Sequence, residues 1–505
     1  MFDKKIFISV VLILLQSFLV ETSAQSAFSG YTLYNPLGSY TAYLIDMDGN
    51  IAHSWACNCS VSDNVYLLED GTLLRCGRYN NIYLNGAAAG GRIQKIDWNG
   101  NLIWDYIYST TNVCQHHDIE AMPNGNVLLI AWEKKTASEA KIAGSENTQE
   151  IWPLHIVEVE QTGTATGNIV WEWHLWDHLV QDYDQTKENY GVVTDHPELM
   201  NINFFGDKKS SGYDWLHTNA INYNEELDQI VISSHTLNEF YIIDHSTTTE
   251  EAAVHTGGDR GMGGDFLYRW GNPQAYNCGS SSDKKFYVCH DSQWIADGLE
   301  GEGNILIFNN GEGRPGGNAS SIEEIIPPTD AFGNYLINPG SAFGPENQSW
   351  EYFTPHFALH LSGAQRLPNG NTLICEGPLG NLIEISPDED IVWEFNIGGS
   401  CTRAYRYAPD YSGLSQLSIN ELNVPDFNFD IYPNPTNGVF SVDIDILENS
   451  NCEIVIFNTL GVIIKNVTNL NTIDLSQFEK GVYIVNIEFT IYNKKVCRNK
   501  LLIKN

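Results

Sequence analysis

The sequence predicts an all-β protein, with a six-bladed β-propeller followed by a small C-terminal β-sandwich. Short apolar segments bounded by Gly, Asn or Asp recur along the 505 residues, which is typical of strands joined by tight turns. Six segments also repeat a tryptophan ending, at Trp55, Trp104, Trp171, Trp270, Trp350 and Trp393. Antiparallel strands at a long and roughly even period favour propeller blades over the alternative, an array of β-sandwiches.

The first 24 residues have the order of a secretory signal peptide. MFDKK supplies positive charge, IFISVVLILLQSFLV is apolar, and TSAQ contains small residues. A membrane anchor is the alternative, but the apolar run is shorter than the roughly 20 residues that a spanning helix needs. We therefore expect export with cleavage near Ala24, and no transmembrane segment in the mature chain.

The charge balance excludes nucleic acid as a partner. The chain has 63 acidic and 27 basic residues, a net charge of −36, whereas binding to phosphates needs a basic face. Ten cysteines in an exported chain could form disulfides, and Cys452 and Cys497 are candidates to pair with each other. Their spacings match no zinc motif, so we expect neither a metal nor a cofactor.

The propeller is predicted to cover residues 25–409. A strand precedes five of the six tryptophan endings, and these strands read EDGTLLRC, PNGNVLLIAW, LDQIVISS, EGNILIFN and PNGNTLIC. The first blade is split, because 31–57 gives some of its strands and CTRAYRYAP at 401–409 can give another. Pairing of these two ends would close the ring of blades.

Four histidines stand at matching positions before turns. His117 and His217 lie seven residues before Asn124 and Asn224, His360 lies nine before Asn369, and His290 lies eleven before Gly301. The innermost strand of each blade lines the central channel, so equivalent positions should converge at one mouth. A ring of imidazoles suits acid–base catalysis, nucleophilic attack or metal binding. The alternative is that each histidine bonds a neighbouring backbone group and closes a turn.

Two further features could complete such a site. Arg314 follows an inner strand in ILIFNNGEGRPGG, where a guanidinium could hold a tetrahedral oxyanion, although a solvated charge is the alternative. Long inserts at 133–155, 176–213 and 312–349 should shape the channel mouth. They carry aromatic residues, including Trp152, Trp176 and Tyr183, that could stack on phenolic rings or sugars.

Roughly residues 30–415 resemble the bacterial arylsulfotransferase family. The resemblance rests on HHDIEAMPNGNVLLI, DWLHTNAINYNEELDQIVISS, CHDSQWIADGLEGEGNILIFNNGEGR, SGAQRLPNGNTLICEG and TRAYRYAPDY. It implies a six-bladed propeller with a central active site. It also implies transfer of a sulfuryl group from an aryl sulfate to a phenol through a sulfated histidine, without the nucleotide donor PAPS.

The resemblance also implies roles for individual residues. His217 and His290 resemble active-site histidines of the family, and Arg314 resembles its sulfate-binding arginine. The nucleophilic histidine should fall in GPLGNLIEI, where Asn381 stands and cannot carry a sulfuryl group. His360 or His356 could replace it, or transfer could be direct. His116, His117 and Asn381 are the candidates for substrate binding.

Residues 429–505 are predicted to form a separate β-sandwich after a polar linker at 410–428. FDIYPNPTNGVFSVDI, EIVIFNTLGVIIK and IDLSQFEKGVYIVNI read as strands separated by turns. In this order PNPTNG, NTLG and KGVYIV resemble the C-terminal sorting domain of the type IX secretion system of Bacteroidota. That resemblance implies a secreted or cell-surface protein and the secretion machinery as a partner; a carbohydrate-binding sandwich is the alternative.

Four function classes remain open from the sequence. The first is the sulfuryl transferase, and the second is an inactive or divergent propeller that binds ligands at the cell surface. The third is a metal-dependent enzyme with His116, His117 and Asp118 among its ligands. The fourth is a quinoprotein, because TGNIVWEW resembles the tryptophan repeats of that class.

Overall fold

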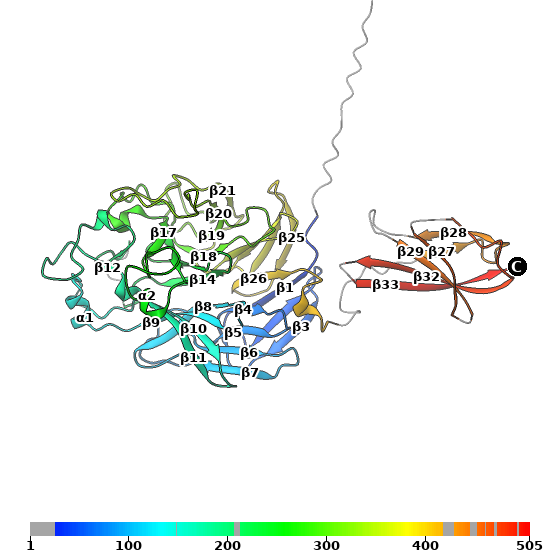
Figure 1. Cartoon of the computed structure of the whole chain (residues 1–505), viewed down its shortest axis with the longest axis horizontal. Coiled ribbons are helices and arrows are strands. Elements are labelled where there is room, and N and C mark those ends of the chain that lie inside the picture. Colours follow the sequence, from blue (N-terminus) through cyan, green and yellow to red (C-terminus); the bar gives the residue numbers. More distant parts are fainter. Residues whose placement is uncertain are drawn as a thin grey trace, which may run out of the picture.

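The computed structural model describes residues 26–505 except 148, 207–212, 418–428, 445–451, 460, 469–471 and 492–493. The predicted signal peptide and much of the predicted linker lie outside these residues. The described chain is all-β, as predicted, with strands joined mostly by short turns (Figure 1). In the described residues no helix has the length and apolar character needed to cross a membrane.

Strands between residues 31 and 407 form six four-stranded antiparallel sheets. The first sheet contains β26 (Cys401–Tyr407), β1 (Tyr31–Pro36), β2 (Thr41–Ile45) and β3 (Ile51–Ala56). The second contains β4 (Val61–Leu67), β5 (Leu73–Arg78), β6 (Gly91–Ile96) and β7 (Leu102–Ile107), and the third contains β8 (Val113–Ala121), β9 (Val127–Glu133), β10 (Leu154–Gln161) and β11 (Gly167–His174).

The other three sheets repeat this order. The fourth contains β14 (Thr218–Asn224), β15 (Gln229–Ser234), β16 (Glu239–Asp244) and β17 (Phe266–Trp270). The fifth contains β18 (Cys289–Trp294), β19 (Ile305–Asn309), β20 (Ser321–Ile325) and β21 (Trp350–Phe353), and the sixth contains β22 (Gly363–Arg366), β23 (Thr372–Glu376), β24 (Asn381–Ile385) and β25 (Ile391–Asn396).

The six tryptophan endings all lie on the last strand of a sheet, which explains their regular recurrence. The apolar strands that were predicted as inner strands are the second strands, β5, β9, β15, β19 and β23. A polar strand precedes each of them: β4, β8, β14, β18 and β22. The sequence pattern missed these strands because they carry few apolar residues.

The segment 401–409 supplies a strand to the first sheet, as predicted. β26 pairs antiparallel with β1, so that Tyr31 lies opposite Tyr407 and Leu33 opposite Tyr405. β26 is therefore the first strand of this sheet. The first strands also contact one another in a cycle, from β4 through β8, β14, β18, β22 and β26 back to β4.

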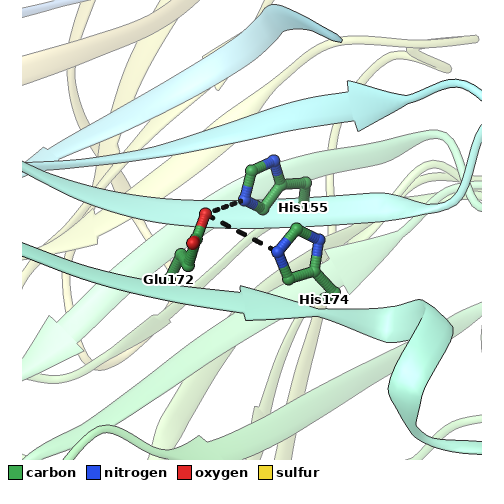
Figure 2. A group of neighbouring side chains, drawn as sticks. All are labelled: His155, Glu172 and His174. Atoms are coloured by element: carbon green, nitrogen blue, oxygen red, sulfur yellow. Dashed lines mark hydrogen bonds and ion pairs between the residues drawn. The ribbon is translucent and has the colours of Figure 1, made fainter. Parts of the chain in front are cut away.

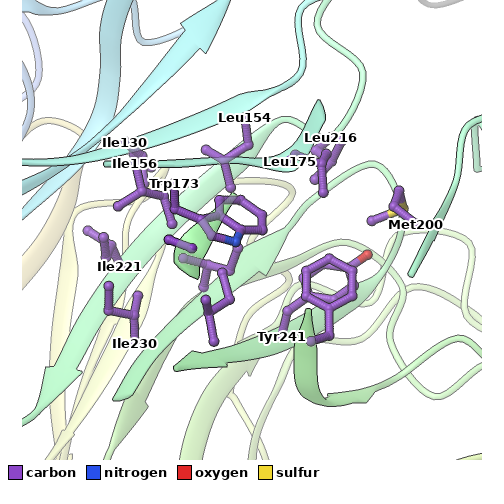
Figure 3. Close-up of a cluster of buried hydrophobic side chains, with 14 of the residues drawn as sticks. Ile130, Leu154, Ile156, Trp173, Leu175, Met200, Leu216, Ile221, Ile230 and Tyr241 are labelled. Carbon is purple, nitrogen blue, oxygen red and sulfur yellow. The ribbon is translucent and has the colours of Figure 1, made fainter. Parts of the chain in front are cut away.

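Hydrophobic side chains fill the spaces between consecutive sheets. In Figure 3, Ile130, Ile156 and Trp173 of the third sheet pack with Ile230 and Tyr241 of the fourth. Equivalent clusters join each of the other consecutive pairs, including the sixth sheet with the first. Burial of these faces holds the sheets together and fixes where their first strands meet.

The predicted Asn-Gly turns have the expected backbone. Gly125 and Gly370 have φ of +88° and +85°, a region that glycine occupies without steric cost. The preceding asparagines close the same turns, because the Oδ1 atoms of Asn124 and Asn369 accept hydrogen bonds from the backbone two residues later. Local sequence therefore fixes the hairpins that lead into β9 and β23.

Short elements decorate the sheets. They are α1 (Ala137–Ile142), α2 (Thr249–Ala252), the 3-10 helices η1 (Leu175–Asp177), η2 (Val193–Asp195), η3 (Pro273–Tyr276) and η4 (Ser412–Leu414), and the parallel pair β12 (Leu179–Val180) and β13 (Met200–Asn201). Half of them, α1, η2, β12 and β13, lie wholly within the long inserts that the sequence predicted. η4 differs from expectation, because it falls in the predicted linker and Leu414 and Leu417 are buried against the first two sheets.

The C-terminal segment forms two more sheets. One contains β27 (Phe429–Tyr432), β28 (Val439–Ile444) and β31 (Thr472–Asp474), and the other β30 (Ile463–Thr468), β29 (Cys452–Asn458), β32 (Gly481–Ile491) and β33 (Lys494–Lys504). One hydrophobic cluster, which includes Phe440, Ile456 and Leu502, joins the two sheets. All members of the cluster come from this segment.

The disulfide prediction finds no support among the described cysteines. Eight cysteines are free thiols, and six of them are buried. The Sγ atoms of Cys375 and Cys401 lie 3.4 Å apart. The side chains of Cys452 and Cys497, the predicted pair, lie outside the described ones.

Candidate functional site

The first strands of four sheets are interrupted at equivalent places. Register shifts occur between Val61 and Val65, Gln115 and Ile119, Thr218 and Ala220, and His290 and Gln293. Such bulges re-aim side chains and are common beside active sites. The residues inside the bulges are polar and buried, for example Asp63, His117 and Asp291.

The histidines that sequence spacing singled out gather at one pocket. Its volume is about 810 Å³, and His117, His217, His290 and His360 all line it. Imidazole rings follow one another along its wall: 4.6 Å separates the centroids of His117 and His217, and 4.8 Å those of His217 and His235. Residues from separate sheets thus meet at one place.

His217 and Asp214 form a hydrogen-bonded pair. The Nδ1 of His217 lies 2.6 Å from Oδ2 of Asp214, and Oδ1 of Asp214 accepts a 2.8 Å hydrogen bond from the indole of Trp132. Burial alone would raise the pKa of Asp214, but its interactions with His217, His116 and Trp132 together lower that pKa. An ionised carboxylate at Nδ1 fixes the tautomer and leaves Nε2 as a nucleophile or base.

The ring of His290 is also fixed through its Nδ1 atom, but its partner is an amide and not a carboxylate. Its Nδ1 donates to Oδ1 of Asn310 at 2.6 Å, which again leaves Nε2 without the proton. Burial lowers the pKa of His290 to about 3, so this imidazole is neutral at physiological pH. His290 can therefore accept a proton or a hydrogen bond in the pocket.

His116 and His117 bond to each other through their Nδ1 atoms. Their Nδ1 atoms lie 2.8 Å apart, and the ring of His116 stacks on Trp132. Burial lowers the pKa of His116 to about 3. The third residue of the proposed ligand set, Asp118, is held by hydrogen bonds from Asn64 and Tyr66, so the three side chains do not offer a common ligand set.

Asp63 is a buried carboxyl group in the wall of the same pocket. Its residue is 3% exposed, and neither carboxylate oxygen has a hydrogen-bond partner among the described residues. Burial raises the pKa of Asp63 to about 7, although Thr402 and Arg403 favour the ionised form. A carboxyl group that titrates near neutrality can both give and take a proton.

Arg403 on β26 links the innermost residues of three sheets. Its Nη1 lies 2.8 Å from Oδ2 of Asp118, its Nε lies 3.0 Å from Oδ1 of Asp291, and its Nη2 donates to the carbonyl oxygen of Asn219. Burial alone would lower the pKa of Arg403, but the two carboxylates raise it well above its usual value. This ion-pair network is a structural support for the pocket residues.

Comparison with known families identifies the larger part of the chain. The model of the family described as "Arylsulfotransferase (ASST)" matches residues 23–407. The chain belongs to the arylsulfotransferase family. The family supports an arylsulfotransferase-like function, with aryl sulfates and phenols as the implied substrates.

A second family model, the "Secretion system C-terminal sorting domain", matches residues 430–504. The arylsulfotransferase domain is therefore followed by a type IX sorting domain, as predicted. This domain supports secretion and a cell-surface location. It also accounts for the separate hydrophobic cluster of the C-terminal sheets.

Solved structures resemble the chain only distantly. A protein of unknown function from Bacteroides caccae is 12% identical, with a TM-score of 0.41, and the match covers 75% of this chain and 98% of that one. A putative 6-phosphogluconolactonase from Bacteroides fragilis is 10% identical, with a TM-score of 0.38 and coverage of 75% and 98%. A catalytically inactive virginiamycin B lyase from Staphylococcus aureus is 10% identical, with a TM-score of 0.35 and coverage of 74% and 88%. At these TM-scores none of them informs the function, and no curated protein matches the chain.

Arg314, which resembles the sulfate-binding arginine of the arylsulfotransferases, lies outside the lining of the histidine pocket. Its guanidinium pairs with Glu351 at 2.9 Å and Glu323 at 3.2 Å. It also donates to the hydroxyl of Ser321 and stacks over the ring of Phe353. Two acidic partners already neutralise this arginine, whereas Arg78 is the guanidinium among the pocket-lining residues.

Asn381, at the expected place of the arylsulfotransferase nucleophile, also lies outside the pocket lining. Its Nδ2 donates to Glu376, which bonds His356 at 2.9 Å as well. His356 and Asn381 therefore share one carboxylate on the sixth sheet. Of the two histidines suggested as replacements, His360 reaches the pocket and His356 does not.

Several pocket residues were missing from the sequence prediction. Asp63 lies seven residues before Asp70 of the Asp-Gly turn, the same spacing as His117 before Asn124, so the repeat could have revealed it. Asp214 stands in the quoted DWLH motif, three residues before His217. Arg78 is the last residue of the second strand β5, and His235 follows the second strand β15. The sequence prediction considered only residues that precede these strands.

Proposed function

We propose that this arylsulfotransferase moves a sulfuryl group from an aryl sulfate to a phenol in the histidine pocket, without PAPS. The observation that carries the proposal is the pairing of His217 with Asp214 at 2.6 Å, because it leaves Nε2 of His217 as a nucleophile within the pocket. His217 then takes the role for which Asn381 is chemically unfit.

The fold that we propose for residues 25–409 is a closed six-bladed β-propeller. Three observations support it: six four-stranded sheets, a cycle of contacts between their first strands, and a hydrophobic cluster between every consecutive pair. β26 would act as the closing strand, since it joins the end of this region to its first sheet. Closure would hold the pocket residues of separate blades in fixed positions.

The reaction would proceed in two displacements. Nε2 of His217 attacks the sulfur of the donor, the N–S bond forms, and the S–O bond to the aryl group breaks. The leaving phenolate takes a proton from Asp63. The oxygen of the acceptor phenol then attacks sulfur, the N–S bond breaks, and the acceptor proton passes to Asp63, which restores the starting state.

Neighbouring groups supply the electrostatic part of this mechanism. Arg78 is suited to hold sulfate oxygens, because its guanidinium can make two parallel hydrogen bonds to an oxyanion. Neutral His290 and His117 can line the reacting group without adding charge. A protonated Asp63 also avoids repulsion between a carboxylate and the incoming sulfate ester.

The test follows phenol release from a chromogenic aryl sulfate, with and without an acceptor phenol and without PAPS. We expect release to depend on the acceptor, and His217→Ala to abolish it. His356→Ala is the matched control and should keep activity, because this exposed histidine lies outside the pocket. Release into water alone would indicate a sulfatase, and no release from a broad set of donors would favour the second candidate, a ligand-binding surface module.

We also propose that residues 1–24 are a signal peptide and that the sorting domain directs type IX export. The order of charge, apolar run and small residues supports the first part, and the family match at 430–504 supports the second. N-terminal sequencing of the protein recovered from the cell surface tests the cleavage near Ala24. Recovery with residues 1–24 still present would contradict it.

A further inference from the structure

Two histidines and a glutamate face one another on the outer half of the third sheet (Figure 2). His155 comes from β10, and Glu172 and His174 come from β11. His155 and His174 lie directly opposite each other in the strand register. Glu172 lies two residues before His174 and therefore projects from the same face. Strand geometry alone brings the three side chains together.

The donor atoms of this cluster have the spacing of metal ligands. Oε2 of Glu172 lies 3.2 Å from Nε2 of His155 and 3.6 Å from Nε2 of His174. Zinc bonds of about 2.1 Å at tetrahedral angles would separate two ligand atoms by about 3.4 Å. The three donor atoms all lie within 4.8 Å of one another, so a small rotation of the side chains would suffice to surround an ion.

The other ring nitrogen of each histidine is already occupied. Nδ1 of His155 lies 3.2 Å from the hydroxyl of Tyr108, and Nδ1 of His174 lies 3.1 Å from Oε2 of Glu133. Metal-bound histidines usually bond such a partner through the nitrogen that does not bind the metal, which fixes the ring and its tautomer. Both imidazoles therefore direct Nε2 toward the same oxygen of Glu172.

The stacking of the rings is compatible with a shared ion. The ring centroids of His155 and His174 lie 4.0 Å apart at an interplanar angle of 15°. Two imidazolium rings in this arrangement would repel each other, whereas two neutral rings that share a cation would not. The side chain of Glu172 is 35% exposed, so water can complete the coordination shell.

We propose that His155, Glu172 and His174 bind one divalent transition-metal ion such as zinc, with water as a further ligand. The site would fasten β10 to β11 at the outer edge of their sheet. None of its residues lines the histidine pocket, so the site is separate from the proposed transfer reaction. Two histidines and one carboxylate suit a borderline metal better than calcium or magnesium, which prefer oxygen ligands.

A second group of possible ligands, His178, His255 and Asp265, lacks this arrangement. Both histidines bond Asp265 through Nδ1, and Nε2 of His178 is bonded to the carbonyl oxygen of Ala252. His178 thus has both nitrogens engaged and no free lone pair for an ion. This group provides a matched control.

The experiment titrates Zn²⁺ into the mature protein after a chelator has removed bound metal, and calorimetry measures the heat of binding. Absorption spectra with Co²⁺ in place of zinc report the coordination geometry. We expect one equivalent to bind with a dissociation constant below about 10 µM. His174→Ala and Glu172→Gln should each weaken this binding by at least about 100-fold, since each removes a ligand. His255→Ala and His217→Ala should leave it unchanged.

The side chains of His174 and Glu172 are partly exposed, so we expect both variants to fold like the wild type, and the transfer assay checks this. The proposal would be overturned if the wild type bound no zinc up to about 100 µM. This concentration is well above the dissociation constant that we expect for a site with three protein ligands. It would also be overturned if His174→Ala bound zinc as tightly as the wild type. Zinc binding lost in His217→Ala or His255→Ala instead would place the ion elsewhere.

Discussion

Asp63 combines burial, a lack of hydrogen-bond partners and a place in the pocket wall. An ionised carboxylate in such surroundings is costly, which is why the pKa rises to about 7. This unfavourable burial occurs in the wall of the pocket where we propose that the reaction takes place. His217 differs from Asp63 in having a hydrogen-bond partner. The carboxylate of Asp214 fixes its ring and leaves Nε2 reactive.

Asp63→Asn should change how stability depends on pH. The pKa of about 7 in the folded protein exceeds the ordinary value of about 3.9, so the folded state binds more protons between these values. The wild type therefore loses stability as pH rises from about 4 to 7, and the cost is complete above pH 7. Asparagine cannot ionise, so we expect the variant to gain roughly 2–4 kcal/mol relative to the wild type between pH 5 and pH 8.

Thermal unfolding of both proteins at pH 5 and pH 8 measures this difference. Asp291 and Glu323, whose pKa values burial also raises to about 7, are present in both proteins and cancel in the comparison. An equal difference between variant and wild type at the two pH values would show that Asp63 titrates normally. The same variant should lose transfer activity, because the proton carrier is gone.

Arg78→Gln and Arg314→Gln should separate two possible sulfate ligands. Loss of a charge-assisted contact in the transition state typically costs a factor of about 100–1,000, so we expect this fall in kcat/KM for Arg78→Gln. Arg314→Gln should change kcat/KM by less than about threefold, because Glu323 and Glu351 already hold this side chain. Steady-state kinetics with a chromogenic aryl sulfate decide between them, and the reverse result would assign the sulfate to Arg314.

β26 is the element on which the pocket depends most. It supplies the first strand of the first sheet, and Arg403 on this strand pairs with Asp118 of β8 and Asp291 of β18. The same strand contacts both β4 and β22. Bulges in the facing strands turn the acidic side chains toward Arg403, so strand pairing and ion pairing support each other.

Arg403→Met should destabilise the protein by about 3–5 kcal/mol, because it leaves two buried carboxylates without a cation. Asp118 and Asp291 have side-chain exposures of 0% and 3%, so water cannot take the place of the guanidinium. Chemical unfolding at pH 7 measures the loss. Lys134→Met removes a partly exposed ion pair with Glu150 and should change stability by at most about 1 kcal/mol. A similar effect of both variants would contradict the structural role of Arg403.

Across the whole molecule, the hydrophobic clusters divide the chain after residue 417. Leu414 and Leu417 pack in the cluster that joins the first two sheets, and the hydroxyl of Tyr411 donates to the carbonyl oxygen of Leu67. The cluster of the sorting domain uses residues from Phe429 to Leu502 and none from the larger part. The predicted boundary at 409 therefore omits residues that pack on the arylsulfotransferase domain.

A chain that ends at residue 417 should keep its fold and transfer activity, because no hydrophobic cluster is cut. A chain that ends at residue 409 exposes the surface covered by Leu414 and Leu417, and we expect its thermal midpoint to fall by several degrees, as for a loss of about 2–4 kcal/mol. Scanning calorimetry and the aryl sulfate assay on both chains test this. Equal midpoints would show that residues 410–417 contribute nothing to the larger domain.

Local pattern was enough to predict the apolar strands, the Asn-Gly turns and the family, but it missed the polar first strands. These features depend on neighbouring residues, since a turn or an amphipathic strand is specified within a few positions. The spacing of the histidines before the turns was enough to bring His117, His217, His290 and His360 to one pocket. Strand repetition carries equivalent residues to equivalent places, so this prediction needed no knowledge of the packing between sheets.

Partnership between distant charges could not be predicted in this way. Whether an arginine is free for a ligand depends on the carboxylates that packing brings beside it, which is why Arg314 is neutralised while Arg78 lines the pocket. Burial without a partner gives Asp63 its pKa of about 7, and no property of its neighbours in the chain reveals that burial. Side-chain chemistry follows from local sequence, whereas its electrostatic environment follows from contacts between residues hundreds of positions apart, such as Asp118 and Arg403.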